Sequence, residues 1–188
     1  MKLEYCCQCG AKLIKREIGD EGIASFCEKC SKYYFDNPKC CVLISIINNE
    51  VNGDNNINNI NKTNDKKVLL LKQNYISTEK WTLCSGYVQH GETFEQAVSR
   101  EVLEETGQIV IKSNYVKSYY REDKGIIMAG FVAFVQPCEF GVSKEVDDLR
   151  WFNYNDVDSI IAKDNNFSYE HLNACMDFIN SKETNFYI

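Results

Sequence analysis

The stretch Gly86–Gly107 reads GYVQHGETFEQAVSREVLEETG and predicts one helix with an acidic face. Thr93 can cap the start of this helix, and Gln96 follows in its first turn. Gly107 stands just past the other end, where a residue with left-handed backbone closes a helix. We therefore expect the helix to span Thr93–Thr106.

Three carboxylates of this helix, Glu101, Glu104 and Glu105, fall in one stripe at about 100° per residue. Like charges four residues apart destabilise a helix by about 0.2–0.5 kcal/mol, and burial makes the repulsion worse. A divalent cation with oxygen ligands removes this penalty, so the stripe predicts a Mg²⁺ or Mn²⁺ site. Arg100 can hold the carboxylate of Glu104 in place. A solvated charged face is the alternative, which the fixed offsets of Glu92 and Arg100 disfavour.

The offsets within this stretch resemble the signature of the Nudix hydrolase superfamily. That signature is a glycine, five residues, a glutamate, seven residues, and then Arg-Glu-aliphatic-x-Glu-Glu-x-Gly-aliphatic. The matching positions are Gly86, Glu92, Arg100, Glu101, Val102, Glu104, Glu105 and Gly107, whereas Gln108 replaces the last aliphatic residue. The resemblance implies an α/β fold, the Nudix α/β/α sandwich with a mixed sheet.

The sequence on either side of the signature resembles the same family. The segment Trp81–Gly86 (WTLCSG) stands where many members have Trp-x-Leu-Pro-Gly-Gly, so Cys84 and Ser85 replace proline and glycine. In the family, the carbonyl just before the signature glycine can bind the metal, which makes Ser85 a candidate ligand. Further on, KEVDDLRWF (144–152) resembles the family's late Glu-x-x-x-x-x-Trp-Phe strand and makes Glu145 a candidate.

The reaction that this resemblance implies is the attack of water on one phosphorus of a P–O–P bridge. Metal ions held by Glu101, Glu104, Glu105 and Glu145 would neutralise the diphosphate and activate the water. Glu145 or one of the signature glutamates would take the proton, and Arg100 would orient its neighbours.

Four aromatic residues are candidates for stacking on a substrate base: Tyr34, Tyr119, Tyr120 and Phe131. For the last three, which fall on predicted strands, packing in the core or on the surface is at least as good an interpretation.

Apolar runs outside the signature predict the rest of the sheet. The expected strands are Cys40–Ile47, Lys67–Gln73, Trp81–Val88, Ile109–Glu122, Gly125–Gln136 and Leu149–Tyr154. Leu172, Cys175, Met176 and Ile179 have helical spacing and predict a last helix that docks on the core. Residues 48–66 are dominated by Asn, Asp, Gly and Lys, so we expect a mobile, low-complexity loop there.

Two cysteine knuckles, Cys6-x-x-Cys9 and Cys27-x-x-Cys30, are separated by seventeen residues near the N-terminus. This spacing is typical of a zinc ribbon, in which four thiolates surround one Zn²⁺. Gly10 follows the first knuckle, where a positive φ is often needed. Such a closed site has no position for water, so its zinc should be structural. A pair of disulfides or unpaired thiols are the alternatives.

The Asp36-Asn37-Pro38 turn suggests a boundary between a zinc ribbon at 1–36 and a Nudix hydrolase domain at 37–188. This order resembles NADH pyrophosphatases and the plant-type FAD and ADP-ribose pyrophosphatases. However, Ser118–Gly125 (SYYREDKG) departs from the Ser-Gln-Pro-Trp-Pro-Phe-Pro segment of the bacterial NADH enzymes. The expected substrate is a nucleoside-diphosphate derivative of the ADP-ribose, NAD(H) or FAD class. The resemblance also implies a homodimer.

Other functions remain open at this point: a catalytically silent Nudix ligand sensor, clean-up of nucleoside triphosphates, or RNA decapping. The net charge of −6 gives no electrostatic footprint for nonspecific nucleic-acid binding, so a ribbon that binds nucleic acid is disfavoured. No apolar run resembles a signal peptide or a membrane span. Ten cysteines without a disulfide-like pattern fit a reducing, cytoplasmic setting.

The Asn-rich segment gives a first testable prediction. Deleting residues 50–64 should leave the melting temperature and turnover nearly unchanged, because the segment has too few apolar residues to make core contacts and loop length has a small entropic cost. Thermal unfolding and steady-state kinetics of the deletion variant check this. A large loss of either would mean that the loop is ordered or covers the site.

Overall fold

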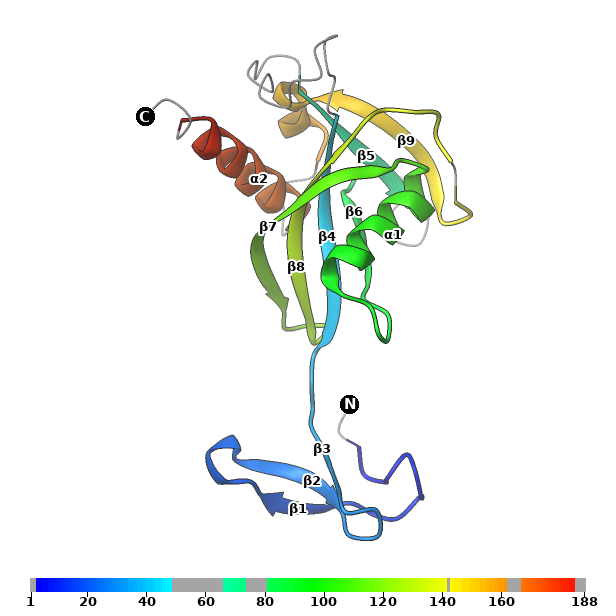
Figure 1. The fold of residues 1–188 in the computed structure, drawn as a ribbon, viewed down its shortest axis with the longest axis vertical. Coiled ribbons are helices and arrows are strands. Elements are labelled where there is room, and N and C mark those ends of the chain that lie inside the picture. The colour runs from blue at the N-terminus through cyan, green and yellow to red at the C-terminus, as the bar shows by residue number, and fades with distance from the viewer. Residues whose placement is uncertain (1–2, 49–65, 74–80, 142, 162–166, 185–188) are drawn as a thin grey trace. The chain divides into compact units, whose positions relative to one another are not determined.

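The computed structural model describes residues 3–48, 66–73, 81–141, 143–161 and 167–184. The chain forms two compact units, Met1–Pro38 and Lys39–Ile188, which are described separately (Figure 1). The expected domains, 1–36 and 37–188, stay a prediction about which segments fold independently. Apart from its first and last residues, the Asn-rich segment 48–66 lies outside the described ranges.

The first unit is a small antiparallel sheet with very little core. Its strands are β1 (Ile14–Glu17), β2 (Ile23–Cys27) and β3 (Lys32–Tyr34), in the order β1-β2-β3, with a 3₁₀ turn η1 (Gly19–Glu21) between the first two. The buried apolar side chains of this unit are Cys6, Ala24, Phe26 and Cys27. A unit of this size normally needs a metal or disulfides for stability.

The second unit is built on a mixed sheet with strand order β7-β8-β4-β5-β9, and β6 pairs with β4. β4 and β8 run parallel, while the other pairs are antiparallel. The elements are β4 (Lys39–Asn48), β5 (Lys67–Gln73), β6 (Cys84–Tyr87), α1 (Phe94–Thr106), β7 (Val110–Arg121), β8 (Ile126–Val135), β9 (Val146–Asn153), η4 (Tyr154–Ser159) and α2 (Phe167–Thr184).

The two helices lie on opposite faces of this sheet, and each covers its own apolar cluster (Figure 1). Along β4, Val42 and Ile44 face the cluster of α1, whereas Leu43 and Ile47 face the cluster of α2. Because successive side chains of a strand point to opposite faces, a strand covered on both sides has to be apolar at nearly every position. This confirms the expected α/β/α sandwich and explains the run CCVLISII.

One edge of β4 is shared by two strands. Its residues Cys41–Ile44 pair with β6, and Ile46 and Ile47 pair with β5. The strand expected at Trp81–Val88 is therefore shorter, because Thr82 makes only an isolated bridge to Leu71. The sharing brings β6, which carries the signature glycine, under α1.

β9 starts earlier than the expected Leu149, because it pairs along the whole of β5 from Val146 onward.

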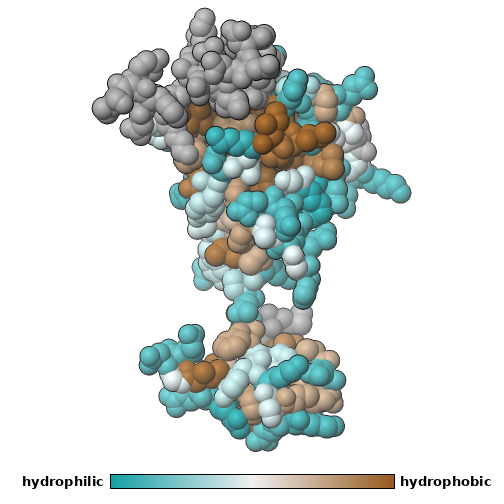
Figure 2. All heavy atoms as spheres, viewed as in Figure 1, coloured by the Kyte–Doolittle hydropathy of each residue, from teal (hydrophilic) through white to brown (hydrophobic). Residues whose placement is uncertain are grey.

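The surface drawn in Figure 2 is apolar over the beginning of β7, and Leu103, Ile109 and Ile111 near this point are exposed. No helix among the described residues is both long enough and apolar enough to cross a membrane.

Candidate active site

Helix α1 is fixed at both ends by the residues that the sequence singles out. The Thr93 hydroxyl accepts from the Gln96 N–H at 3.3 Å, and the Gln96 side chain accepts from the Thr93 N–H at 2.8 Å. This capping box satisfies donors that the first turn leaves free. At the other end, Gly107 has φ 74° and donates to the Leu103 carbonyl at 2.9 Å. The predicted start and end of the helix are confirmed.

Arg100 joins three carboxylates on one side of α1. Its Nε and Nη2 donate to the two oxygens of Glu92 at 2.8 and 3.0 Å. Its Nη1 donates to Glu101 at 2.6 Å and to Glu104 at 3.0 Å. Nη2 also reaches the Tyr87 carbonyl at 3.0 Å, which ties the helix to the end of β6. The fork of one guanidinium thus fixes side chains from the loop and from the helix.

Glu92 closes the loop that precedes α1. Besides binding Arg100, its carboxylate accepts from the Gln89 N–H at 2.9 Å. The hydrogen bonds from Arg100 and Gln89 lower the pKa of Glu92 below its ordinary value. These hydrogen bonds favour the anionic form of Glu92, whose carboxylate braces this loop.

Glu101 lies directly against the backbone of β6. A Cβ built on Gly86 would stand 1.9 Å from the Glu101 carboxylate carbon, so any side chain at that position would displace the carboxylate. Glu101 is buried, and this burial raises the pKa of its carboxyl although Arg100 opposes the shift. The signature glycine is thus required by the carboxylate that it accommodates.

Glu105 is the most deeply buried carboxylate of the stripe, at 5% exposure, whereas Glu104 is exposed. Gln73 donates to one of its oxygens at 2.7 Å, and the other oxygen is buried with no partner among the described residues. The pKa of Glu105 is raised from 4.5 to about 7, mainly by burial and in part by the charges of Glu101 and Glu145. A buried oxygen of this kind suits a bound cation.

Glu145 and Ser85 are the other predicted metal ligands. Glu145 is exposed just before β9, where its N–H donates to the Ser143 hydroxyl at 3.2 Å, and its charge acts on Glu105. Ser85 lies half-buried in β6, opposite Leu43 of β4. Within the described ranges, no three carboxylates have their oxygens as close together as the thiols described next.

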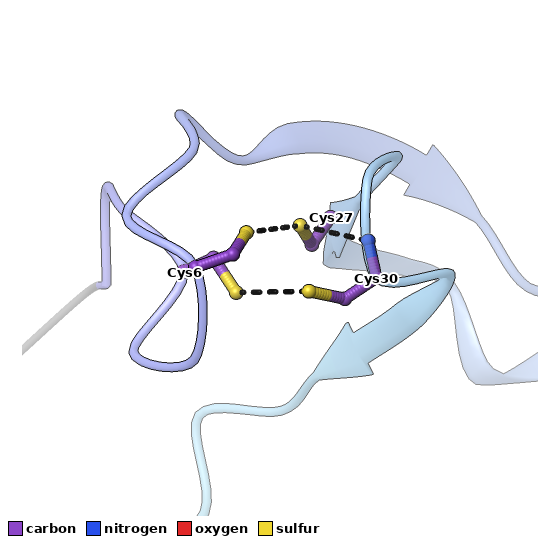
Figure 3. Close-up of side chains that lie close together, drawn as sticks. Cys6, Cys27 and Cys30 are labelled. Atoms are coloured by element: carbon purple, nitrogen blue, oxygen red, sulfur yellow. Dashed lines mark hydrogen bonds between the residues drawn. The ribbon is translucent and has the colours of Figure 1, made fainter.

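The four predicted cysteine ligands converge on one point in the first unit, with all four sulfurs within 4.8 Å of one another. The Sγ atoms of Cys6 and Cys30 are 3.9 Å apart, and those of Cys9 and Cys27 are 3.5 Å apart (Figure 3). Four thiolates about 2.3 Å from one Zn²⁺ would lie about 3.8 Å apart in a tetrahedron. All four are free thiols, so the arrangement fits a metal and not two disulfides.

The backbone around this cluster follows the same course after each knuckle. Gly10 has φ 71°, as expected, and Ser31 has φ 53° at the same offset after the second knuckle. The sequence analysis did not predict the positive φ of Ser31, although Ser31 follows Cys30 directly, as Gly10 follows Cys9. Cys30 also donates its N–H to the sulfur of Cys27 at 3.4 Å.

Tyr34 belongs to the cysteine cluster. Its hydroxyl lies 3.0 Å from the Cys6 sulfur, and this hydrogen bond lowers the pKa of Cys6 from 9.0 to about 6. This contact indicates a role for Tyr34 in stabilising the Cys6 thiolate, whereas stacking on a base was the expected role.

Two of the remaining aromatic candidates have buried rings, one on each face of the sheet, and this burial favours the alternative of core packing over stacking on a base. Tyr119 is 6% exposed and packs on α2, with its hydroxyl 3.2 Å from Nδ1 of His171. Phe131 is 3% exposed in the cluster under α1. Tyr120 is exposed and stays a candidate, and the exposed Tyr115, edge-on to Phe131 at 5.8 Å, was missed.

Comparison with known proteins identifies the family. Residues 56–175, well over half of the chain, match the model of the NUDIX domain. The chain belongs to the NUDIX domain family. The match spans β5, β6, the glutamate helix α1, β7, β8, β9 and the first half of α2, whereas β4 lies before it.

Among curated proteins, the chain is 27% identical over 155 residues to "NAD-capped RNA hydrolase NudC" from Escherichia coli O1:K1 and from E. coli SMS-3-5. The alignment covers 82% of this chain and 53% of each relative, so the chain spans about half the length of these relatives.

Solved structures with the same fold include a NUDIX hydrolase from Nitrosomonas europaea. It has a TM-score of 0.58 and 26% identity over 87% of this chain and 86% of that one. The NUDIX domain of Shewanella oneidensis NrtR, crystallised with ADP ribose, has a TM-score of 0.60 and 16% identity over 82% and 94% of the two chains. The second likeness concerns the fold alone.

The raised pKa of Glu105 gives a prediction about stability without added metal. A pKa that rises from 4.5 to about 7 on folding stabilises the protein below pH 4.5, and this contribution is lost as the pH rises through 7. Glu105→Gln removes the titration. The free energy of unfolding of the variant minus that of wild type should therefore increase by up to about 3 kcal/mol between pH 4.5 and pH 8.

Denaturant unfolding followed by tryptophan fluorescence measures this difference, because both tryptophans, Trp81 and Trp151, lie in the second unit. Glu95→Gln is the matched control, since Glu95 is exposed on the same helix. A pH-independent difference between wild type and Glu105→Gln would contradict the burial of this carboxylate.

Proposed function

We propose that this protein hydrolyses the P–O–P bridge of a nucleoside-diphosphate derivative with metal-activated water. The observation that carries the proposal is the buried pair Glu101 and Glu105, one of which keeps an oxygen without a partner among the described residues. Two buried carboxylates on one helix are costly without a cation. The family match and the curated relatives support hydrolysis as the activity.

The proposed ligands of Mg²⁺ or Mn²⁺ are Glu101, Glu104, Glu105 and Glu145, with the carbonyl of Ser85. Bound there, the cation would neutralise the diphosphate and lower the pKa of a water molecule. Glu104 is exposed, so it can swing from Arg100 toward a cation with little loss of packing.

The other side chains position and transfer protons. Arg100 holds Glu101 on β6 while Glu92 remains its counter-ion, so the Glu101 carboxylate is oriented before substrate binds. Glu145 is exposed beside Glu105 and can take the proton of the attacking water, as the signature glutamates also can. Its exposure lets the proton leave to solvent.

The proposed substrates are small molecules of the ADP-ribose, NAD(H) or FAD class. The names of the curated relatives, hydrolases of NAD-capped RNA, favour the NAD moiety and make the NAD cap of an RNA a second candidate. The net charge of −6 favours a free nucleotide over an RNA. Tyr115 and Tyr120 are exposed rings on β7 that could stack on the base.

Glu105→Gln should lower kcat by at least about a hundredfold at saturating Mg²⁺ or Mn²⁺, because the amide cannot balance the charge of the cation. Turnover is measured with ADP-ribose, NADH, FAD, nucleoside triphosphates and an NAD-capped RNA in one panel. Glu95→Gln should match wild type. Wild-type activity retained in Glu105→Gln would rule out the metal assignment, and no turnover of any substrate would favour the silent ligand sensor.

We also propose that Cys6, Cys9, Cys27 and Cys30 hold one structural Zn²⁺. Purified protein should contain about one zinc per chain, and Cys27→Ser should lose it and unfold the first unit. Elemental analysis and proteolysis near residues 1–38 measure the two effects. Cys40→Ser, a change at an exposed cysteine outside the cluster, is the control. A folded first unit without zinc would refute the site.

The proposed assembly is a homodimer with the ribbon near the interface. It is supported by the small core of the first unit and by the apolar patch near the beginning of β7. Light scattering at micromolar concentration should give twice the chain mass. A monomer would contradict the proposal. None of the ten cysteines forms a disulfide, which supports the further proposal that the protein works in a reducing compartment such as the cytoplasm.

A further inference from the structure

Gln108 is a buried amide at a position where the Nudix signature has an aliphatic residue. It has no exposed surface, and it makes two hydrogen bonds to the backbone of one residue. Its Oε1 accepts from the Cys138 N–H at 3.0 Å, and its Nε2 donates to the Cys138 carbonyl at 3.1 Å. The amide thus pairs with Cys138 as a neighbouring strand would.

Two further contacts join the same two segments. The Gly141 N–H donates to the Thr106 carbonyl at 3.1 Å, and the Cys138 thiol lies 3.5 Å from the Gly107 carbonyl. A Cβ built on Gly107 would stand 2.2 Å from the Gly141 nitrogen, so the two backbones touch with no side chain between them. The end of α1 is therefore bound directly to the backbone at 138–141.

The bound segment leads to Glu145, the proposed ligand or base. After Glu145 the chain enters β9, where Val146 pairs with Gln73 of β5. Gln73 in turn donates to Glu105. Glu145 thus lies between two fixed points, and both of them contact the helix that carries the other carboxylates.

We propose that Gln108 is a positioning residue that holds Glu145 at a fixed place relative to Glu101 and Glu105. The proposal rests on the proposed function for the role of Glu145, but the tether itself is a property of the folded chain. An aliphatic side chain could fill the same volume, but it would leave the Cys138 N–H and carbonyl without these partners. The departure from the signature is then a specific device of this chain.

Hydrogen exchange tests the tether without any substrate. Gln108→Met keeps the length and burial of the side chain and removes both hydrogen bonds. The amides of Cys138, Gly141 and Glu145 should then exchange at least roughly tenfold faster, while those of α1 up to Glu105 stay as in wild type. Gln136→Met makes the same change at an exposed position of the same connection and should alter neither. Unchanged exchange in Gln108→Met would overturn the proposal.

A double-mutant cycle tests the connection to Glu145. If Gln108 acts through Glu145, Gln108→Met and Glu145→Gln should each lower kcat, and the double variant should be close to Glu145→Gln alone. Independent, multiplicative losses would overturn the positioning role and leave Gln108 a packing residue.

Wild-type protein without activity on any substrate of the panel would refute the proposed function, and the exchange rates would still decide the tether. If Gln108→Met failed to fold, the wild-type amides of Cys138 and Gly141 would decide it, because the tether requires that they exchange as slowly as the last turn of α1.

Discussion

The burial of two carboxylates on one helix face is the constraint on which the second unit depends. Ionised carboxylates cannot remain unpaired away from water, so every neighbour of α1 must compensate for them. Arg100 balances the charge of Glu101 from the solvent side. Gln73, on the sheet side, donates a hydrogen bond to one of the two carboxylate oxygens of Glu105. The remaining oxygen has no partner among the described residues, and the raised pKa of Glu105 reflects this incomplete compensation. Gly86 has no side chain because the Glu101 carboxylate occupies that space.

The first unit also gathers acidic groups at one point, but it has few apolar side chains to hold its fold without a metal. Four thiols are gathered where few apolar side chains can stabilise them, and the hydrogen bond from Tyr34 favours the anionic form of Cys6. Thiolates at this spacing repel one another unless a cation lies between them. In this unit the proposed cation would complete the fold, because Ala24 and Phe26 are the only buried apolar side chains besides cysteines among its described residues. In the second unit the apolar clusters on both faces of the sheet hold the fold, so the cation proposed there is not needed for folding.

Sequence reasoning predicted the features that depend on neighbours in the chain. The caps of α1, the strands with two apolar faces and the cysteine knuckles all follow from local spacing. The burial of Tyr119 did not, because β7 has irregularities of register, one of them between Tyr115 and Lys117. Such a shift interrupts the alternation of faces, so Tyr115 and Tyr119 lie on opposite sides although they are four positions apart. The partners Gln73 and Cys138 were also missed, because they are about thirty residues away from Glu105 and Gln108.

The departures from the family's usual residues at Cys84 and Gln108 place polar groups around the acidic helix. Cys84 stands where many members have proline. It is fully buried, and its burial together with the charge of Glu105 raises the pKa of the thiol well above its ordinary value. It stays a neutral thiol that can donate a weak hydrogen bond to the carboxylate, which proline could not do. Gln108 likewise replaces an apolar contact by two directed bonds. Both changes add polar groups around the acidic helix, and a buried polar group is tolerated only where its partner is held in place. Such substitutions make the positions of the neighbouring backbone and carboxylates more specific, as the proposed cation site would require.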